Sequence, residues 1–98
     1  MKRPAYKIGE LRGAPRTYRC HVAILKEEEG GFSAIVLNLP GAGSSGPSEE
    51  IVVERVREAV VGLIESYLEN GEEIPWESPG EYEIPEGAEQ KWVLVDAW

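Results

Sequence analysis

The sequence has few of the residues from which catalytic and metal sites are usually built. Its 98 residues include one cysteine, one histidine and one aspartate, namely Cys20, His21 and Asp96. A single cysteine excludes an intramolecular disulfide and a cysteine-based metal cluster. A single histidine excludes a histidine-based metal site, and a carboxylate cluster for a divalent cation would have to consist mainly of glutamates. We therefore expect no metal, no cofactor and no enzymatic activity.

Long apolar runs are also missing. No stretch approaches the roughly 18 consecutive apolar residues of a membrane-spanning helix, and the N-terminus lacks an apolar signal core. We therefore expect a cytoplasmic protein without a membrane partner. The chain length is that of one domain, which can bury a modest core without disulfides.

Positive charge is scarce beyond the first residues. Residues 1–19 carry six basic residues and one acidic residue, a net charge of +5, whereas residues 20–98 carry four basic and 17 acidic residues, a net charge of −13. An acidic body repels nucleic-acid phosphates and attracts basic proteins, although such charge can also serve solubility alone. Residues 1–17 contain prolines and glycines without a clear period, and we expect them to form a basic N-terminal arm. Nucleic acid would be bound, if at all, through that arm.

The longest amphipathic segment, residues 48–70, predicts the main helix. At 100° per residue one face gathers Val52, Val53, Val56, Ala59, Val60, Leu63, Ile64 and Tyr67. Ser48 is a suitable N-cap, and Gly71 is suitable as the residue after the C-terminus. Because many of its residues are β-branched, the helix must take its stability from packing rather than propensity. We expect it to lie on a sheet and to bury Val56, Val60 and Leu63.

Four strands are predicted around this helix. Residues 18–25 and 32–37 each have the pattern of a strand, in which successive side chains point to opposite faces. They predict an antiparallel hairpin with Gly30 and Gly31 in the turn between them. Residues 42–45 predict a weak third strand, and residues 92–95 a closing strand. The order β-β-β-α-β predicts an α+β domain over residues 18–98, with one main helix packed on one face of one sheet.

Two short patterns suggest chemistry but are better explained structurally. Cys20 and His21 could be a nucleophile and its base, but neighbouring residues of a strand point to opposite faces. Gly41, Gly43 and Gly46 have the spacing of a dinucleotide-binding loop, but they follow a hairpin strand and precede two glutamates. Carboxylates at a helix start would repel a phosphate.

The run GGFSAIVLNLPGAGSSGPSEE, the helix with Ala59 and the following LENGEEIPW together resemble the HicB-like antitoxin domain of bacterial and archaeal toxin–antitoxin systems. The resemblance covers residues 18–76, and residues 91–95 stand where the family's closing strand would be. The matching residues are Gly31, Phe32, Ala34, Leu39, Pro40, Gly41, Ser44, Gly46, Ser48, Glu50, Ala59, Leu68, Glu72, Ile74 and Pro75.

This resemblance implies a partial RNase-H-like β-β-β-α-β fold and a non-enzymatic task. The task would be to cover a small, basic, RNA-cleaving toxin of the HicA type, often within a dimer or tetramer. An alternative is an orphan HicB-like domain that acts as a structural or regulatory homo-oligomer without a toxin. An RNase-H-like enzyme is a weaker third alternative, because the strands offer no converging carboxylates.

The sequence departs from the family pattern at several positions. Asn38 replaces the usual acidic residue, Ala42 replaces a frequent cysteine, and Gly46, Pro47 and Ser48 replace a Gly-Asp-Thr sequence before the helix. Serine can cap a helix in place of threonine, so the fold should be retained. The helix-turn-helix or ribbon-helix-helix module that many members carry is not recognisable, so operator binding is not expected.

The closing strand predicts self-association. Trp92 and Leu94 point to one of its faces, and Val93 and Val95 point to the other. One helix can cover only one of these faces, and apolar surface left over commonly marks an interface. We expect a homo-oligomer, a dimer or larger, with Val93 and Val95 near the centre of its interface.

A second candidate contact lies on the helix. Val61 and Leu68 are seven residues apart and form a ridge beside the expected buried face. The competing possibility is that the N-terminal arm folds over the open face through Tyr6, Ile8 and Leu11. In that case the protein would be a monomer.

Overall fold

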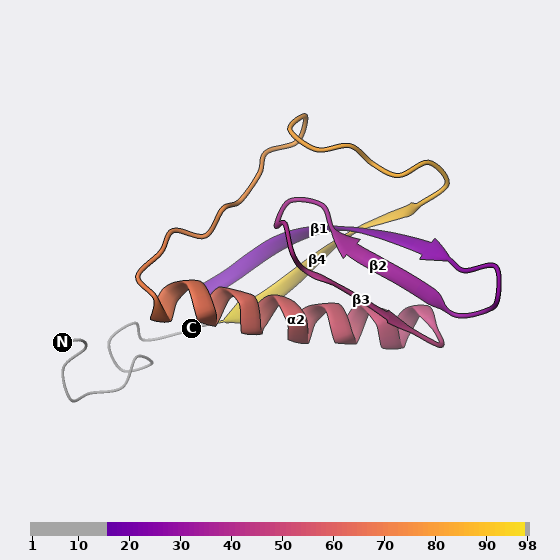
Figure 1. Ribbon diagram of the computed structural model, residues 1–98, viewed down its shortest axis with the longest axis horizontal. Helices are drawn as coiled ribbons and strands as arrows, with labels where there is room; N and C mark the ends of the chain where they lie inside the picture. Colours follow the sequence, from indigo (N-terminus) through magenta and orange to yellow (C-terminus); the bar gives the residue numbers. More distant parts are fainter. Residues whose placement is uncertain (1–15, 98) are drawn as a thin grey trace.

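The computed structural model describes residues 16–97, which form a four-stranded antiparallel sheet with one long helix against one face (Figure 1). The elements are β1 (Arg16–Lys26), β2 (Phe32–Val36), β3 (Gly43–Gly46), α2 (Glu49–Glu69) and β4 (Glu89–Ala97). The spatial order of the strands is β3-β2-β1-β4, so β3 and β4 are the edges. The predicted α+β class and the order β-β-β-α-β are confirmed.

The predicted arm falls mostly outside this region. Residues 1–15 lie outside the described residues, and so do the proposed docking residues Tyr6, Ile8 and Leu11. Arg16 and Thr17, which were assigned to the arm, already belong to β1. The division into an arm and a domain therefore stays a prediction.

The β1–β2 hairpin turns at two glycines, as expected. Both Gly30 and Gly31 have positive φ angles, of 100° and 84°. At Gly31 a side chain would also be crowded, because a Cβ there would lie 3.0 Å from the carbonyl oxygen of Gly46. Beyond the turn the strands pair from Lys26 opposite Phe32 to Val22 opposite Val36, which completes the hairpin.

The ends of α2 follow the sequence signals. The hydroxyl of Ser48 accepts a hydrogen bond from the backbone N–H of Ile51, as an N-cap does. At the other end Gly71 has a φ of 70°, and its N–H donates to the carbonyl of Leu68. This left-handed residue after the helix satisfies one of the free carbonyls of the last turn.

The core lies between α2 and the inner face of the sheet. The helix buries Val52, Val56, Val60 and Ile64, at every fourth position. The prediction is confirmed for Val56 and Val60, but Leu63 is only partly buried and lies at the rim of the core, close to Gly41. Ile64 takes the central position because the buried line runs four residues at a time from Val52. The sheet contributes Cys20, Val22, Ile24, Ala34, Val36, Val93, Val95 and Ala97, and the segment between β2 and β3 contributes Leu39 and Ala42.

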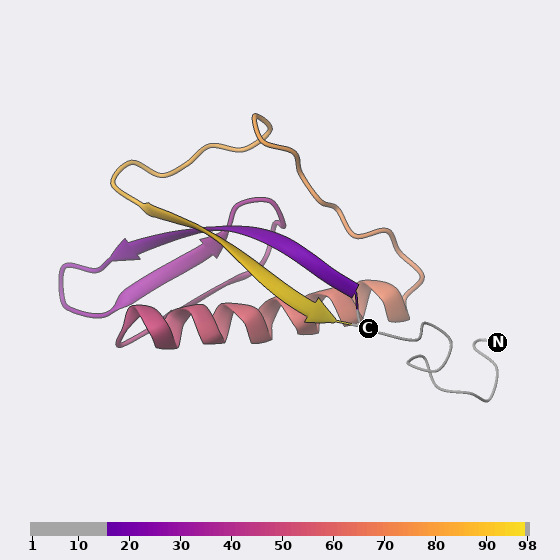
Figure 2. The same ribbon diagram turned by 180° about the vertical axis from the view of Figure 1, so that it is seen from behind.

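Residues 71–88 form a long connection from α2 to β4, which we call the acidic linker. Figures 1 and 2 show that this linker leaves the C-terminal end of the helix and crosses to the opposite side of the sheet before it joins β4. It is fixed first at Trp76, whose ring stacks on Tyr18 with centroids 5.5 Å apart, and then by a hydrogen bond from the N–H of Glu77 to the carbonyl of Asn38. The sheet is therefore covered by the helix on its inner face and partly by the acidic linker on its outer face.

In residues 16–97 no helix is both long and apolar enough to cross a membrane.

Candidate interaction surface

The two patterns that suggested chemistry have structural positions. Cys20 is buried in the core on the inner face, and His21 lies on the outer face, so the two side chains cannot act as a nucleophile and its base. Burial raises the pKa of the Cys20 thiol to about 11, although the charge of Arg57 acts in the opposite direction. Gly43 and Gly46 begin and end an edge strand instead of a phosphate-binding loop. Within residues 16–97 no three histidine, cysteine or acidic side chains come together as a metal site would require.

Asn38 has a role that the sequence analysis missed. Its side-chain oxygen accepts the backbone N–H of His21 at 2.9 Å, and its amide nitrogen donates to the carbonyl of Arg19 at 3.0 Å. The side chain thus continues the β1–β2 ladder where the backbone of β2 has turned away. A carboxylate could accept the first bond but could not donate the second one. The departure from the acidic residue usual in the resembling family is therefore explained by this pairing.

His21 fastens the acidic linker to the outer face of the sheet. Its Nδ1 lies 2.7 Å from the hydroxyl of Tyr82 in the linker, and its Nε2 lies 3.0 Å from Oε1 of Gln90. The imidazole also stacks on Trp92 of β4, with ring centroids 4.4 Å apart and planes 5° apart. The expected structural role of His21 is therefore confirmed by its position.

Beside this contact lies an exposed apolar surface, which we call the β4 patch and define as Trp92 and Leu94. Their exposed fractions are 49% and 55%, the highest of the large apolar side chains in the described part of the chain. The guanidinium of Arg19 lies 5.1 Å from the centre of the Trp92 ring, a distance typical of a cation–π contact. β4 is an edge strand, so within residues 16–97 no strand pairs with the side of it that faces away from β1, although the side chain of Arg57 donates to the carbonyl of Leu94 there.

The predicted interface residues differ in exposure from what the sequence suggested. The side chains of Val93 and Val95 have exposed fractions of 5% and 2% and pack in the core of one chain, so they offer little apolar surface to a partner, and their part in an interface stays a prediction. The reason for this burial is the register: Val93 pairs with Cys20, and this alternation turns both valines toward α2. Val61 and Leu68 are partly buried against the core, and their part in an interface stays a prediction.

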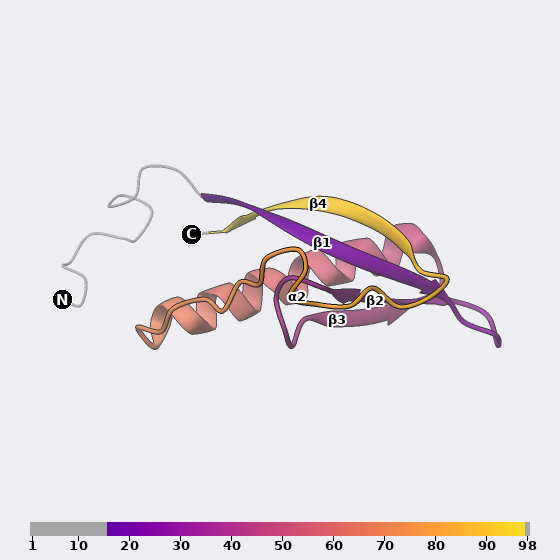
Figure 3. The same ribbon diagram turned by 90° about the horizontal axis from the view of Figure 1, so that it is seen from above.

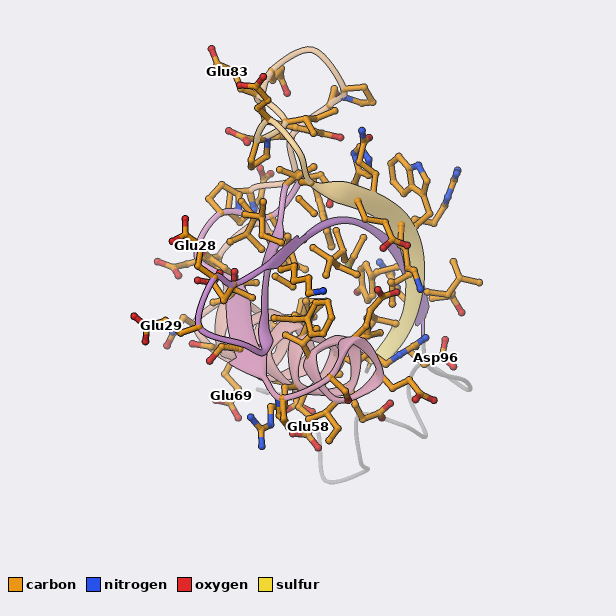
Figure 4. The ribbon with its side chains drawn as sticks, turned by 90° about the vertical axis from the view of Figure 1, so that its right-hand side faces the viewer. Glu28, Glu29, Glu58, Glu69, Glu83 and Asp96 are labelled. Atoms are coloured by element: carbon orange, nitrogen blue, oxygen red, sulfur yellow. The ribbon has the colours of Figure 1, made fainter. Side chains whose placement is uncertain are left out.

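Negative charge is concentrated in the acidic linker. It contains six glutamates and no basic residue, and they are Glu72, Glu73, Glu77, Glu81, Glu83 and Glu86. In the described residues the one ion pair lies elsewhere, between Lys91 and Glu49 at 2.7 Å, and it lowers the pKa of the Glu49 carboxyl. Figure 4 shows Glu83 at the outside of the linker, with Glu58 and Glu69 on the helix. A basic partner would therefore meet carboxylates along this linker that form no ion pair within the described residues.

The contact between His21 and Tyr82 can be tested by releasing the linker. We expect His21→Ala to increase cleavage of the linker by a glutamate-specific protease and to lower the free energy of unfolding by about 1–3 kcal/mol. The reason is that Tyr82 and Gln90 lose their common partner. Tyr82→Phe, which removes only the hydroxyl, should have a smaller effect. Cleavage of the His21→Ala variant at the rate of the unchanged protein would contradict this role.

Two crystal structures of known proteins are similar to this fold. No protein-family model matches the sequence, and no curated protein matches it either. The crystal structure of the N-terminal domain of the Burkholderia pseudomallei antitoxin HicB matches with a TM-score of 0.62 and 27% identity, over 81% of this chain and 99% of that one. The longer crystal structure of the same antitoxin matches with a TM-score of 0.58 and 25% identity, over 80% of this chain. The match spans 61% of the length of that longer protein.

The structural match confirms the resemblance that the motifs indicated. It extends over the strand order and the single helix and includes most of the described residues. The chain has the same α+β fold as the N-terminal domain of the HicB antitoxin, and it is similar to that domain over 81% of its length.

Proposed function

We propose that this protein is an antitoxin-like binding protein that neutralises a small, basic, RNA-cleaving toxin of the HicA type by direct contact. The observation that carries the proposal is the match to the HicB N-terminal domain over 81% of the chain at 27% identity. The protein would act by binding and not by catalysis, and it would act in the cytoplasm.

The charge distribution supports this proposal. A toxin that binds RNA must present basic residues to the phosphates, and an antitoxin can cover the same residues with carboxylates. The acidic linker offers six glutamates, and His21, Trp76 and Asn38 hold it on the sheet. A surface held in place in this way loses little conformational entropy on binding.

Purification of the tagged full-length protein from its native cells tests this function. We expect it to retain a small basic protein with a catalytic histidine, in a complex that survives gel filtration at physiological ionic strength. A variant with the core intact but Glu72, Glu73, Glu83 and Glu86 changed to glutamine should retain less of that protein. Recovery of nothing but further copies of the chain would contradict the antitoxin proposal and favour the orphan homo-oligomer.

A further inference from the structure

Asn38 lies where three segments of the chain meet. Its side chain bonds two backbone groups of β1, and its own carbonyl accepts the N–H of Glu77 in the acidic linker at 3.0 Å. The partners fix the orientation of the amide, because the N–H of His21 needs an acceptor and the carbonyl of Arg19 needs a donor. Asn38 is only 8% exposed, so a polar group of this side chain that lost its partner would be costly.

The linker is held a second time by a residue that bonds the same amide. His21 donates its backbone N–H to the amide oxygen, and its Nδ1 lies 2.7 Å from the hydroxyl of Tyr82. Between the two attachments the linker closes on itself, since the N–H of Glu81 donates to the carbonyl of Ser78 at 2.9 Å. Residues 77–82 are therefore held at both ends by one hydrogen-bonded network.

This network holds half of the carboxylates of the linker. Three of the six linker glutamates lie in the held segment or directly after it, namely Glu77, Glu81 and Glu83. Figure 3 shows the linker running from the C-terminal end of α2 to the start of β4, for most of its course on the β2 side of β1. These three carboxylates keep their positions relative to the sheet only while the network is intact.

We propose that Asn38 is the positioning residue of the acidic linker, and that its amide presents the three carboxylates to a basic partner as one fixed group. The identity of the partner rests on the proposed function, whereas the way in which the linker is held does not. The side chain at this position must accept a bond from one backbone group of β1 and donate a bond to another, and a neutral amide does both.

Asn38→Asp tests this role with almost no change in shape. The carboxylate still accepts the N–H of His21, but it cannot donate to the carbonyl of Arg19 and places a negative oxygen against it. On acidification the carboxylate takes up a proton, and the acid can then donate to that carbonyl. The charged or titratable residues bonded to Asn38 are Arg19, His21 and Glu77, and the unchanged protein also has them. Comparison of the two proteins at the same pH therefore removes their contribution.

Amide hydrogen exchange of the full-length protein, followed by NMR, is the experiment. At neutral pH we expect the N–H of Glu77 to exchange at least about tenfold faster in Asn38→Asp than in the unchanged protein. The ratio should fall towards one at acidic pH. The N–H of Glu27, which donates to the carbonyl of Gly31 at 3.0 Å in the hairpin turn, is the internal control and should keep its rate. His21→Ala retains the backbone bond to Asn38 and should change the exchange at Glu77 less.

Glu77→Pro provides a second variant at the other partner of the bond. Proline removes the N–H that the carbonyl of Asn38 accepts. Glu77→Gln is the matched control, because it removes the same charge and keeps the N–H. A glutamate-specific protease should cleave after Glu83 faster in the proline variant than in the glutamine variant. Cleavage after Glu29 in the hairpin turn, which Figure 4 shows well separated from Glu83, should be equal in both.

The consequence for binding is measured with the basic protein that the tagged chain retains. Asn38→Asp adds a negative charge, which by itself would strengthen the binding of a basic partner. We expect the opposite result, a Kd raised by about threefold or more, because the freed linker must be ordered on binding. A weaker complex in a more acidic variant therefore reports the position of the carboxylates and not their number.

Exchange at Glu77 that keeps the rate of the unchanged protein would overturn the proposal. An equal rise at Glu77 and Glu27 would also overturn it, because the whole fold would then be loosened, and so would equal cleavage of the two Glu77 variants. An unchanged Kd beside faster exchange at Glu77 would show that binding does not depend on how the linker is held, against the proposal. If no basic protein is retained, the antitoxin function fails, while the exchange rates still decide whether Asn38 holds the linker.

Discussion

Replacement of Ile64 with alanine is expected to lower the free energy of unfolding by about 2–5 kcal/mol. Ile64 is fully buried and lies in line with Val52, Val56 and Val60 against the sheet. Alanine there would leave a cavity between α2 and the strands, because a long helix with a rigid partner cannot collapse fully around it. The loss corresponds to a factor of about 30 or more in the folding equilibrium. Chemical denaturation followed by circular dichroism measures it.

Leu63→Ala is the matched control for this substitution. It removes the same number of carbon atoms from the neighbouring position, but Leu63 lies at the rim of the core and is only partly buried. We expect a smaller loss than for Ile64→Ala. Equal losses at both positions, or a midpoint unchanged by Ile64→Ala, would contradict the packing of α2 through this line of residues.

Neutralisation of the acidic linker is expected to slow association with a basic toxin by about tenfold or more at low salt. The variant carries glutamine at Glu72, Glu73, Glu83 and Glu86, which are exposed and accept no hydrogen bond within the described residues. These carboxylates would attract the partner over a distance that falls as ionic strength rises. Stopped-flow measurement of the association rate at several salt concentrations gives the result.

The control for this variant makes an equal change in net charge on α2 instead of the linker. Glu54, Glu58, Glu65 and Glu69 are exposed on the outer side of α2, and their replacement with glutamine also adds four to the net charge. If the linker faces the partner, this second variant should slow association less than the first. An association rate that is the same at low and high salt would show that the acidic surface serves solubility only.

The order of the elements along the chain and the position of the helix could be predicted because local patterns determine them. The helical period of residues 48–70, the cap at Ser48 and the glycine pair at Gly30 and Gly31 each depend on residues close in sequence. Tertiary packing changed only the ends of the strands, where β4 extends over Glu89–Ala97 instead of residues 92–95.

The face of β4 that packs on the helix could not be predicted from its own residues. Both faces are apolar, so alternation alone does not say whether Trp92 and Leu94 or Val93 and Val95 are buried. The pairing of Cys20 with Val93 decides it, because the inner face of β1 is fixed by the core. The larger side chains are then left outside, where Arg19 and His21 contact the ring of Trp92.

The contacts of the acidic linker are long-range and left no local signal. His21 and Tyr82 are 61 residues apart, and Asn38 is 17 residues from the backbone N–H that it accepts. A polar residue in a loop and a lone histidine on a strand each have many possible partners. Only the folded chain brings these groups within hydrogen-bond distance.

Inhibition of RNA cleavage is the measurement that tests the central claim most directly. The small basic protein retained by the chain would be purified alone, given a labelled RNA and titrated with the full-length protein. We expect RNA cleavage to fall to background when enough of the full-length protein has been added to bind all of the basic protein. Cleavage should return when the salt concentration is raised enough to dissociate the two proteins. Cleavage that continues unchanged at a saturating concentration of the chain would contradict an antitoxin function.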